Sequence, residues 1–329
     1  MKVRAIQLDR TGGPEVLQPA EVEVGEPTAG EVRIRHAAIG VNYIDTYHRS
    51  GLYPLPLPAV LGAEGAGTIE AVGAGVTHVA IGERVAYAGG KPGAYAEARV
   101  LDATQVVRLP DSIDFARGAG MLLKGMTVAY LFTKVRSSFG PLVAGDALVW
   151  HAAAGGVGLI ACQWARALGL RLIATASSPE KCALALRHGA THAIDYSHED
   201  VAARVRALTG GEGVKVVYDS VGKDTWERSL DCLRPCGLVV SFGNASGPVP
   251  PVDLAQLLKK GSLYVTRPSL GTYGATHAQV AELSAALFAR VAAGDVVIDP
   301  PRSYPLADAA RAHADLESRT TTGASVLVP

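Results

Sequence analysis

The stretch that decides the fold is ALVWHAAAGGVGLIACQWARALG, residues 147–169. It begins as an apolar strand, turns through small residues and continues with the pattern of an apolar helix. Ala153, Gly155 and Gly158 match the spacing G-x-G-x-x-G, with alanine at the first position. Small residues at such a turn let a pyrophosphate reach the backbone N–H groups at the helix N-terminus. The stretch therefore predicts a dinucleotide-binding turn.

The residues after this turn alternate short apolar strands with longer helical segments. The predicted strands, after Ala147–Ala152, are Arg171–Ala176, His192–Tyr196, Lys215–Val221, Gly237–Gly243 and Ser262–Pro268. This alternation predicts an α/β domain with a doubly wound parallel sheet of six strands, covered by helices on both faces. A glycine cluster by itself also fits a plain tight turn. The strand before it, the helix after it and the five further strands make the nucleotide-binding interpretation the better one.

The rest of the chain has a different pattern. Up to about Pro110 it reads as short strands separated by Gly and Pro, which indicates a mainly β domain. After Pro268 two helical segments, Thr276–Ala293 and Ala307–Ser318, precede a last strand, Ser325–Pro329. Because this tail is too small to fold alone, we expect it to return to the first domain. The predicted division is 1–126, 127–268 and 269–329.

Composition excludes several classes of protein. Lys plus Arg equals Asp plus Glu at 31 each among 329 residues, which is not the footprint of a nucleic-acid-binding protein. The four cysteines lack the spacing of a zinc site or a disulfide framework and suit the reduced thiols of a cytoplasmic protein. The N-terminal residues alternate like a strand rather than a signal peptide. The apolar window 147–165 contains His151 and Gln163, so we expect no membrane segment.

The end of the second strand of the alternating region bears on the choice of cofactor. Ala176, Ser177 and Ser178 stand where a carboxylate would bind a ribose 2′-hydroxyl. Lys181 follows one helical turn later. Hydroxyl groups and an ammonium suit a 2′-phosphate, so the segment favours NADP over NAD. Lys181 also fits an ordinary solvated lysine on a helix.

Long stretches of the chain resemble one family. They are GGPEVL (12–17), GVNYIDTYHRSGLYP (40–54), LKGMTV (123–128), HAAAGGVGLIACQWA (151–165), YDSVGKDTWERSLDCL (218–233), VSFGN (240–244), GSLYVTRPSL (261–270) and LESR (316–319). In these stretches the chain closely resembles the bacterial NADPH:quinone oxidoreductases related to zeta-crystallin, in the medium-chain dehydrogenase/reductase superfamily. The resemblance implies a Rossmann domain, a GroES-like catalytic domain and hydride transfer from NADPH to a quinone.

The resemblance also bears on metal. Zinc-dependent alcohol dehydrogenases of this superfamily place a cysteine, a histidine and a second cysteine where this chain has Asn42, Ala63 and Leu123. An amide, a methyl and an isobutyl group do not make a tetrahedral zinc site. The run 88–95 also lacks the cysteines of a structural zinc lobe. We therefore expect no metal, and we interpret Glu64 as structural.

By the same resemblance, specific residues are expected to bind the cofactor. They are Asn42, Thr127, Ala153, Gly155, Gly156, Val157, Ser177, Lys181, Tyr196, Ser220, Phe242, Gly243, Val265, Arg267 and Arg319. The predicted catalytic set is Asn42, Tyr47 and Tyr53, and Tyr43 is a further candidate wall for the acceptor. Tyrosine rings can stack on a quinone while their hydroxyls face its oxygen, although the cluster also fits a loop support.

Two other functions remain open from the sequence. One is an NADPH-dependent enone or alkenal reductase on the same scaffold. The other is a non-catalytic NADPH-binding protein of the crystallin kind, which accumulates structurally or binds RNA elements. We also expect a homodimer through Leu263–Thr266, because this apolar, β-branched strand lies at the predicted sheet edge.

Overall fold

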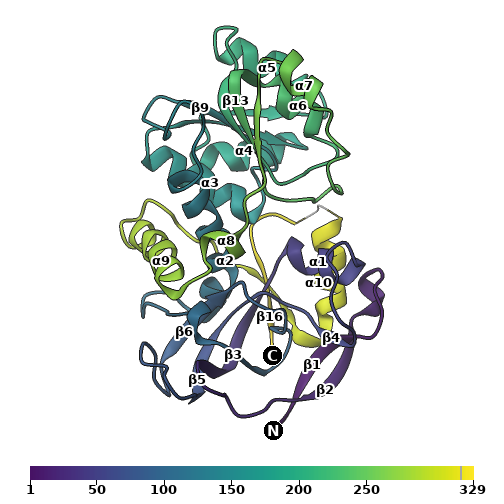
Figure 1. Cartoon of the computed structure of the whole chain (residues 1–329), viewed down its shortest axis with the longest axis vertical. Coiled ribbons are helices and arrows are strands. Elements are labelled where there is room, and N and C mark those ends of the chain that lie inside the picture. Colours follow the sequence, from purple (N-terminus) through teal and green to yellow (C-terminus); the bar gives the residue numbers. More distant parts are fainter. Residues whose placement is uncertain (319–320) are drawn as a thin grey trace. The chain divides into compact units, whose positions relative to one another are not determined.

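The computed structural model describes residues 1–318 and 321–329, which form two compact units. The first unit comprises residues 1–126, 270–289 and 298–329, and the second comprises residues 127–269 and 290–297. Figure 1 shows the purple N-terminal strands and the yellow C-terminal segment within the same unit, although they are far apart in the sequence. Helix α2 (Phe115–Thr133) carries the chain from the first unit into the second.

The second unit contains a six-stranded sheet in the order β11-β10-β9-β12-β13-β14. Every pairing in it is parallel, which confirms the predicted doubly wound sheet. The strand order reverses between β9 and β12, and ligands bind at such a switch point, outside the carboxyl ends of the strands. The strands are β9 (Ala147–Trp150), β10 (Arg171–Ala176), β11 (His192–Asp195), β12 (Val214–Asp219), β13 (Leu233–Ser241) and β14 (Tyr264–Thr266).

The central strands of this sheet, β9, β10 and β12, are apolar because both of their faces are buried. Val149, Ile173 and Val217 pack with Val205 and Trp226 of two covering helices, and all five side chains are at most 5% exposed. The helices of the unit are α3 (Gly156–Ala167), α4 (Pro179–Arg187), α5 (Val201–Leu208), α6 (Trp226–Asp231) and α7 (Leu254–Lys259). The apolar window 147–165 is thus divided between β9 and α3. No helix among the described residues combines the length and the apolarity needed to cross a membrane.

The first unit is mainly β, and the C-terminal residues complete its larger sheet. β16 (Ser325–Val328) pairs antiparallel with β3 (Glu31–Val41) and parallel with β15 (Arg302–Pro305). The sheet order is β15-β16-β3-β5-β6-β8, with β7 also paired to β3. Its other strands are β5 (Glu64–Val72), β6 (Arg84–Ala88), β7 (Ala98–Asp102) and β8 (Val106–Arg108), and a small second sheet contains β1 (Lys2–Leu8), β2 (Gln18–Glu23) and β4 (Ala59–Val60).

One helix of the first unit was not foreseen from the strand-like pattern of this half. α1 (Tyr43–Ser50) begins where Asn42 adopts an extended conformation and donates its backbone N–H to Asp45 Oδ2 at 2.9 Å. It ends at Gly51, whose φ of 82° is left-handed. The remaining helical segments described are α8 (Leu270–Tyr273), α9 (His277–Ala292), α10 (Ala309–Glu317), η1 (Pro14–Val16), η2 (Ala103–Gln105) and η3 (Leu306–Asp308).

The predicted elements differ from the structure at their ends. The expected strand 262–268 is reduced to β14, because Ser262 has a φ of 57° and Pro268 has no N–H for a ladder. β13 instead begins earlier than predicted, at Leu233. The two C-terminal helices and the last strand lie where the pattern placed them, within two residues at each end.

Candidate active site

The dinucleotide turn follows the end of β9. Ala152 has a positive φ of 54°, and the next N–H, of Ala153, donates to Thr175 O at 3.1 Å. Gly155 is the N-cap of α3 with φ −79° and ψ 167°, a conformation open to any residue. A Cβ added to Gly155 would meet only Ala152 O, at 3.3 Å, whereas one on Gly158 would lie 2.5 Å from Ala153 O. The fold therefore requires Gly158 but not Gly155, so the prediction that Gly155 leaves room for a phosphate is the reason that remains for its missing side chain.

The end of β10 presents hydroxyl groups and an ammonium. Ser178 is the N-cap of α4 and accepts from the backbone N–H of Lys181. The Lys181 ammonium lies 3.2 Å from Ser177 Oγ, so these two predicted residues lie close together. Tyr196 follows β11 and donates its backbone N–H to Ala176 O at 3.1 Å. The nearby Asp195 carboxylate accepts from Ser197, within its own loop.

The ends of β12 and β13 hold the next group of predicted cofactor residues. A Cβ on Gly243 would lie 2.4 Å from Ser220 O, so these two loops touch through their backbones. Phe242 donates its N–H to Asp219 O, and its ring lies 5.4 Å from the Trp150 ring. Arg267 donates to Gly243 O at 2.9 Å and thereby joins the end of β14 to this loop.

Three further residues were predicted to bind the cofactor, and the structure describes the surroundings of two of them. Val265 lies on β14 and is exposed, while Thr127 is buried in α2. Arg319 lies outside the described residues. Gly156 and Val157, in contrast, form the first turn of α3 behind Gly155.

The first unit places Asn42 in a buried cluster of opposite charges. Asn42 Nδ2 donates to Glu64 Oε2 at 2.8 Å, and the Lys124 ammonium donates to Asn42 Oδ1 at 2.7 Å. Lys124 also lies 3.3 Å from Glu64 Oε2. Glu64 is fully buried, and Asn42 and Lys124 are each 6% exposed. The amide is therefore held between an anion and a cation.

Of the three positions that were compared with zinc ligands, Asn42 belongs to this cluster, and Ala63 and Leu123 are next in sequence to its other two members. The backbone N–H of Leu123 donates to Glu64 Oε1 at 2.7 Å, and Ala63 is the buried residue before Glu64. Glu64 thus accepts from three donors, as a structural carboxylate does. Among the residues described, His, Cys, Asp and Glu side chains form no group of three that could hold a metal ion.

The tyrosines of α1 and its following loop lie close together. The rings of Tyr47 and Tyr53 are 5.3 Å apart in an edge-to-face arrangement, and Tyr47 is buried. His48 packs its ring 5.9 Å from that of Tyr53, and burial lowers the pKa of His48. Tyr43 donates its hydroxyl to Leu316 O at 3.1 Å and so fastens α1 to α10. Tyr47 and Tyr53 therefore remain the candidates for contact with an acceptor.

A chain of hydrogen bonds links two residues of α1, Asp45 and Arg49, through Tyr95 and His313. Tyr95 donates its hydroxyl to Asp45 Oδ2 at 3.1 Å, and its oxygen lies 2.8 Å from His313 Nε2. Arg49 Nη1 lies 3.1 Å from His313 Nδ1, and Arg49 pairs with Glu317 at 2.7 Å. Burial raises the pKa of Asp45 to about 7 and lowers that of His313 to about 3. A neutral His313 then accepts from Arg49 and donates to Tyr95.

Sequence reasoning missed Lys124 and the hydrogen-bonded chain that runs from Asp45 through Tyr95 and His313 to Arg49. Lys124 carried a usable signal, because it stands alone among apolar and small residues in the central part of α2, MLLKGMTVAYLF. A charged residue in such a segment is buried and paired. The hydrogen-bonded chain from Asp45 through Tyr95 to His313 carried no comparable signal, since these three residues lie on segments remote from one another in the sequence.

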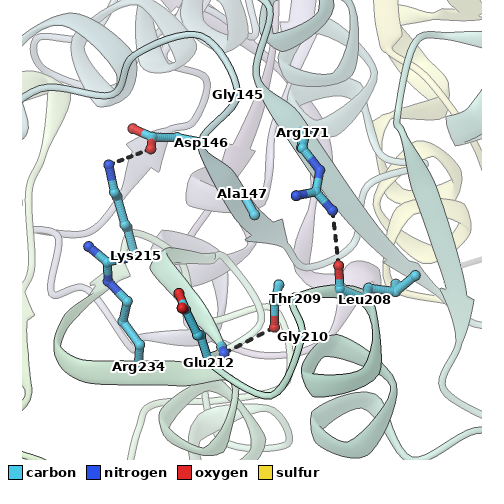
Figure 2. Close-up of a pocket in the computed structure, with 11 residues that line it drawn as sticks. Gly145, Asp146, Ala147, Arg171, Leu208, Thr209, Gly210, Glu212, Lys215 and Arg234 are labelled. Carbon is cyan, nitrogen blue, oxygen red and sulfur yellow. Dashed lines mark hydrogen bonds and ion pairs between the residues drawn. The ribbon is translucent and has the colours of Figure 1, made fainter.

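A separate polar hollow of about 330 Å³ lies at the opposite, amino ends of β9, β10 and β12. Figure 2 shows that two of its cations have partners: Lys215 pairs with Asp146, and Arg171 donates to Leu208 O at 2.9 Å. These contacts satisfy the carbonyl at the end of α5 and a loop carboxylate. The hollow is thus at the wrong end of the sheet for the dinucleotide site.

The turn, the strand ends and the buried amide cluster together define a two-domain, dinucleotide-dependent oxidoreductase. Two family models match the chain: "Alcohol dehydrogenase GroES-like domain" over residues 28–111 and "Zinc-binding dehydrogenase" over residues 156–288. They confirm the expected fold class of a GroES-like domain with a nucleotide-binding domain.

Known relatives narrow this class. A protein of Pseudomonas aeruginosa named quinone oxidoreductase is 55% identical over 99% of both chains. The crystal structure of Escherichia coli quinone oxidoreductase complexed with NADPH matches with a TM-score of 0.96 and 49% identity, over 99% of this chain and all of that one. A 2-haloacrylate reductase of a Burkholderia species is 43% identical over 99% of both chains. The chain belongs to the quinone oxidoreductase family of medium-chain dehydrogenases/reductases.

Proposed function

We propose that this chain is an enzyme that reduces quinones with NADPH and without a metal ion. The observation that carries the proposal is the Asn42–Glu64–Lys124 cluster. The amide of Asn42 stands at one of the positions compared with zinc ligands, and it is hydrogen-bonded to a buried ion pair whose two members adjoin the other two positions, Ala63 and Leu123. A quinone is already electron-poor, so its reduction needs two rings held face to face more than it needs a Lewis acid.

The residues of the second unit fit the proposed cofactor. Gly155 leaves the N-terminus of α3 open to a pyrophosphate, and Ser177 with Lys181 offers donors to a 2′-phosphate. When bound, NADPH supplies the hydride. The remaining proposed contacts are Thr127, Ala153, Gly156, Val157, Tyr196, Ser220, Phe242, Gly243, Val265, Arg267 and Arg319, with Asn42 near the nicotinamide.

The proposed work of the first unit is to orient the acceptor. Tyr47 and Tyr53 present aromatic rings whose edge-to-face packing keeps them rigid. Their hydroxyls can donate to a quinone oxygen as it gains negative charge, while water can deliver the final proton. In this scheme a tyrosine assists turnover but is not an obligatory acid.

A comparison of acceptors tests this function. NADPH oxidation with a simple benzoquinone should be faster than with an unsaturated ketone or a 2-haloacrylate, because the relatives more than 50% identical are named for quinones. Preference for the ketone or the acrylate would favour the enone reductase alternative. Failure to oxidise NADPH with any acceptor would favour a non-catalytic binding protein. Stoichiometric zinc whose removal abolishes turnover would refute the metal-free proposal.

We also propose that two copies pair through β14. This strand is the edge of the six-stranded sheet, and Tyr264 and Val265 on it are 53% and 41% exposed. Leu254 and Leu258 of the preceding helix are likewise exposed, and no strand of the described chain pairs with the outer edge of β14. A second copy of the strand can satisfy both features. A cytoplasmic location is proposed from the four free cysteines.

A further inference from the structure

The Asn42–Glu64–Lys124 cluster determines the orientation of the Asn42 side-chain amide, that is, which partner faces Nδ2 and which faces Oδ1. Asn42 Nδ2 faces the Glu64 carboxylate and Oδ1 faces the Lys124 ammonium, at 2.8 and 2.7 Å. If the amide turned over, its NH₂ would face the ammonium and its oxygen would face the carboxylate. Two buried hydrogen bonds would then become two buried repulsive contacts. The order anion, amide, cation therefore permits one orientation.

The three residues come from three different elements. Asn42 is the N-cap of α1, Glu64 is the first residue of β5, and Lys124 lies in α2. Glu64 is itself held, because its other oxygen accepts the Leu123 N–H at 2.7 Å. Gly40 makes room for this carboxylate, since a Cβ there would lie 2.4 Å from Glu64 Oε2. The surroundings thus fix the anion, and the anion and cation fix the amide.

We propose that Lys124 is a positioning residue for hydride transfer, acting by holding the Asn42 carboxamide in one orientation toward the cofactor. One N–H of Nδ2 and one lone pair of Oδ1 are used inside the cluster, so the remaining N–H and lone pair point in defined directions. The proposal rests on the proposed role of Asn42 in the reaction. In this proposal the Lys124–Glu64 ion pair orients the Asn42 carboxamide, in addition to neutralising two buried charges.

The first test replaces Lys124 with methionine, which has a similar length and no charge. We expect Lys124→Met to lower kcat for benzoquinone by about tenfold to a hundredfold, the usual effect of a misplaced donor near the reacting atoms. The Kd for NADPH and the KM for quinone should change less than threefold. Lys91→Met, at an exposed lysine of the same unit, is the matched control and should leave kcat unchanged.

Lys124→Met leaves a buried carboxylate without its cation and can fail to fold. The double variant Lys124→Met/Glu64→Gln removes both charges. In it, the carbonyl of the introduced carboxamide stays on the Leu123 N–H, so the NH₂ of that carboxamide faces Asn42 and favours the reversed Asn42 amide. We therefore expect a thermal midpoint within a few degrees of wild type and a kcat that stays about tenfold or more below it. Recovery of wild-type kcat would show that the pair only balances charge, which would overturn the proposal.

The variant Asn42→Ala distinguishes the positioning role of Lys124 from the role of Asn42 in the reaction, on which it rests. If Asn42→Ala lowers kcat while Lys124→Met and the double variant retain the wild-type value, the positioning role is wrong and the role of Asn42 stands. If Asn42→Ala itself retains wild-type kcat, both roles are wrong. A parallel loss in all three variants, with NADPH affinity preserved, supports the proposal.

Discussion

Gly155→Ala should separate cofactor binding from folding. The backbone of Gly155 is extended, with φ −79° and ψ 167°, so alanine fits without strain. The new Cβ meets a single atom, Ala152 O, at 3.3 Å, a contact that a shift of a few tenths of an ångström relieves. Alanine is a poorer N-cap than glycine, which costs roughly 0.5 kcal/mol, and its lower entropy in the unfolded chain offsets a similar amount. We expect a change in stability below about 1 kcal/mol.

The effect on NADPH should be much larger. A methyl group at Gly155 stands where the pyrophosphate is proposed to approach the N-terminus of α3. Loss of one charge-assisted hydrogen bond costs about 1.5 to 3 kcal/mol. That range corresponds to a Kd for NADPH weaker by about tenfold to more than a hundredfold.

Gly158→Ala is the matched control for this prediction. Its Cβ would lie 2.5 to 2.6 Å from three backbone atoms of Ala153, so the turn itself must move. We expect a loss of about 1 to 3 kcal/mol in unfolding free energy, measured by urea titration without cofactor. Calorimetry with NADPH completes the comparison. Native NADPH affinity in Gly155→Ala, or a large loss of its stability, would refute the assignment of this glycine to the pyrophosphate.

Four further predictions follow from the structure. NADPH should bind at least tenfold tighter than NADH by calorimetry, and Lys181→Ala should reduce that ratio. Tyr47→Phe or Tyr53→Phe should lower turnover by only about tenfold to a hundredfold, and Tyr53→Ala should lose more in kcat/KM; complete loss in either phenylalanine variant, with binding intact, would identify a required proton donor. Val265→Asp should convert a dimer to a monomer in light scattering, and an unchanged mass would reject the β14 interface. Burial lowers the pKa of His36 from 6.5 to about 4. Between pH 6.5 and pH 4 the imidazole therefore takes up a proton in the unfolded chain but not in the folded one. The free energy of unfolding should fall by up to about 3 kcal/mol as the pH drops from 6.5 to 4. Urea titrations should show that the unfolding free energy of His36→Gln falls less steeply with decreasing pH than that of the wild type. An equal pH dependence in the two proteins would contradict the attribution to His36.

The sequence predicted the second unit well because its signals are local. The central strands β9, β10 and β12 are apolar runs buried on both faces, and Ala153 to Gly158 is a contiguous turn in which the Ala153 backbone gives a steric reason for Gly158. The meeting of Ser177 with Lys181 was also readable, since one helical turn separates them. Local periodicity and turn chemistry were sufficient there.

The first unit was less accessible to the same reasoning. α1 follows a strand, and its start depends on Asp45 accepting the Asn42 N–H, a three-residue relation that the strand-like surroundings hid. The side-chain partners of Asn42 come from residues 64 and 124, Asp45 accepts from Tyr95, and Tyr95 in turn contacts His313. No spacing rule connects such positions. The position of Asn42 came from the family resemblance, whereas its hydrogen-bonding partners required the structure.

The insertion of β16 between β15 and β3 sets an order in which the chain can fold. During synthesis β3 emerges early, yet its partner at residues 325–328 is made nearly three hundred residues later. Until then residues 39–41 of β3 lack their partner strand on this edge, where β7 pairs only with residues 31–35, whereas nearly all of the second unit comes from one continuous segment, residues 127–269. On a translating ribosome the nucleotide-binding unit can therefore close first, while the unit that carries Asn42 waits for the last residues of this sequence.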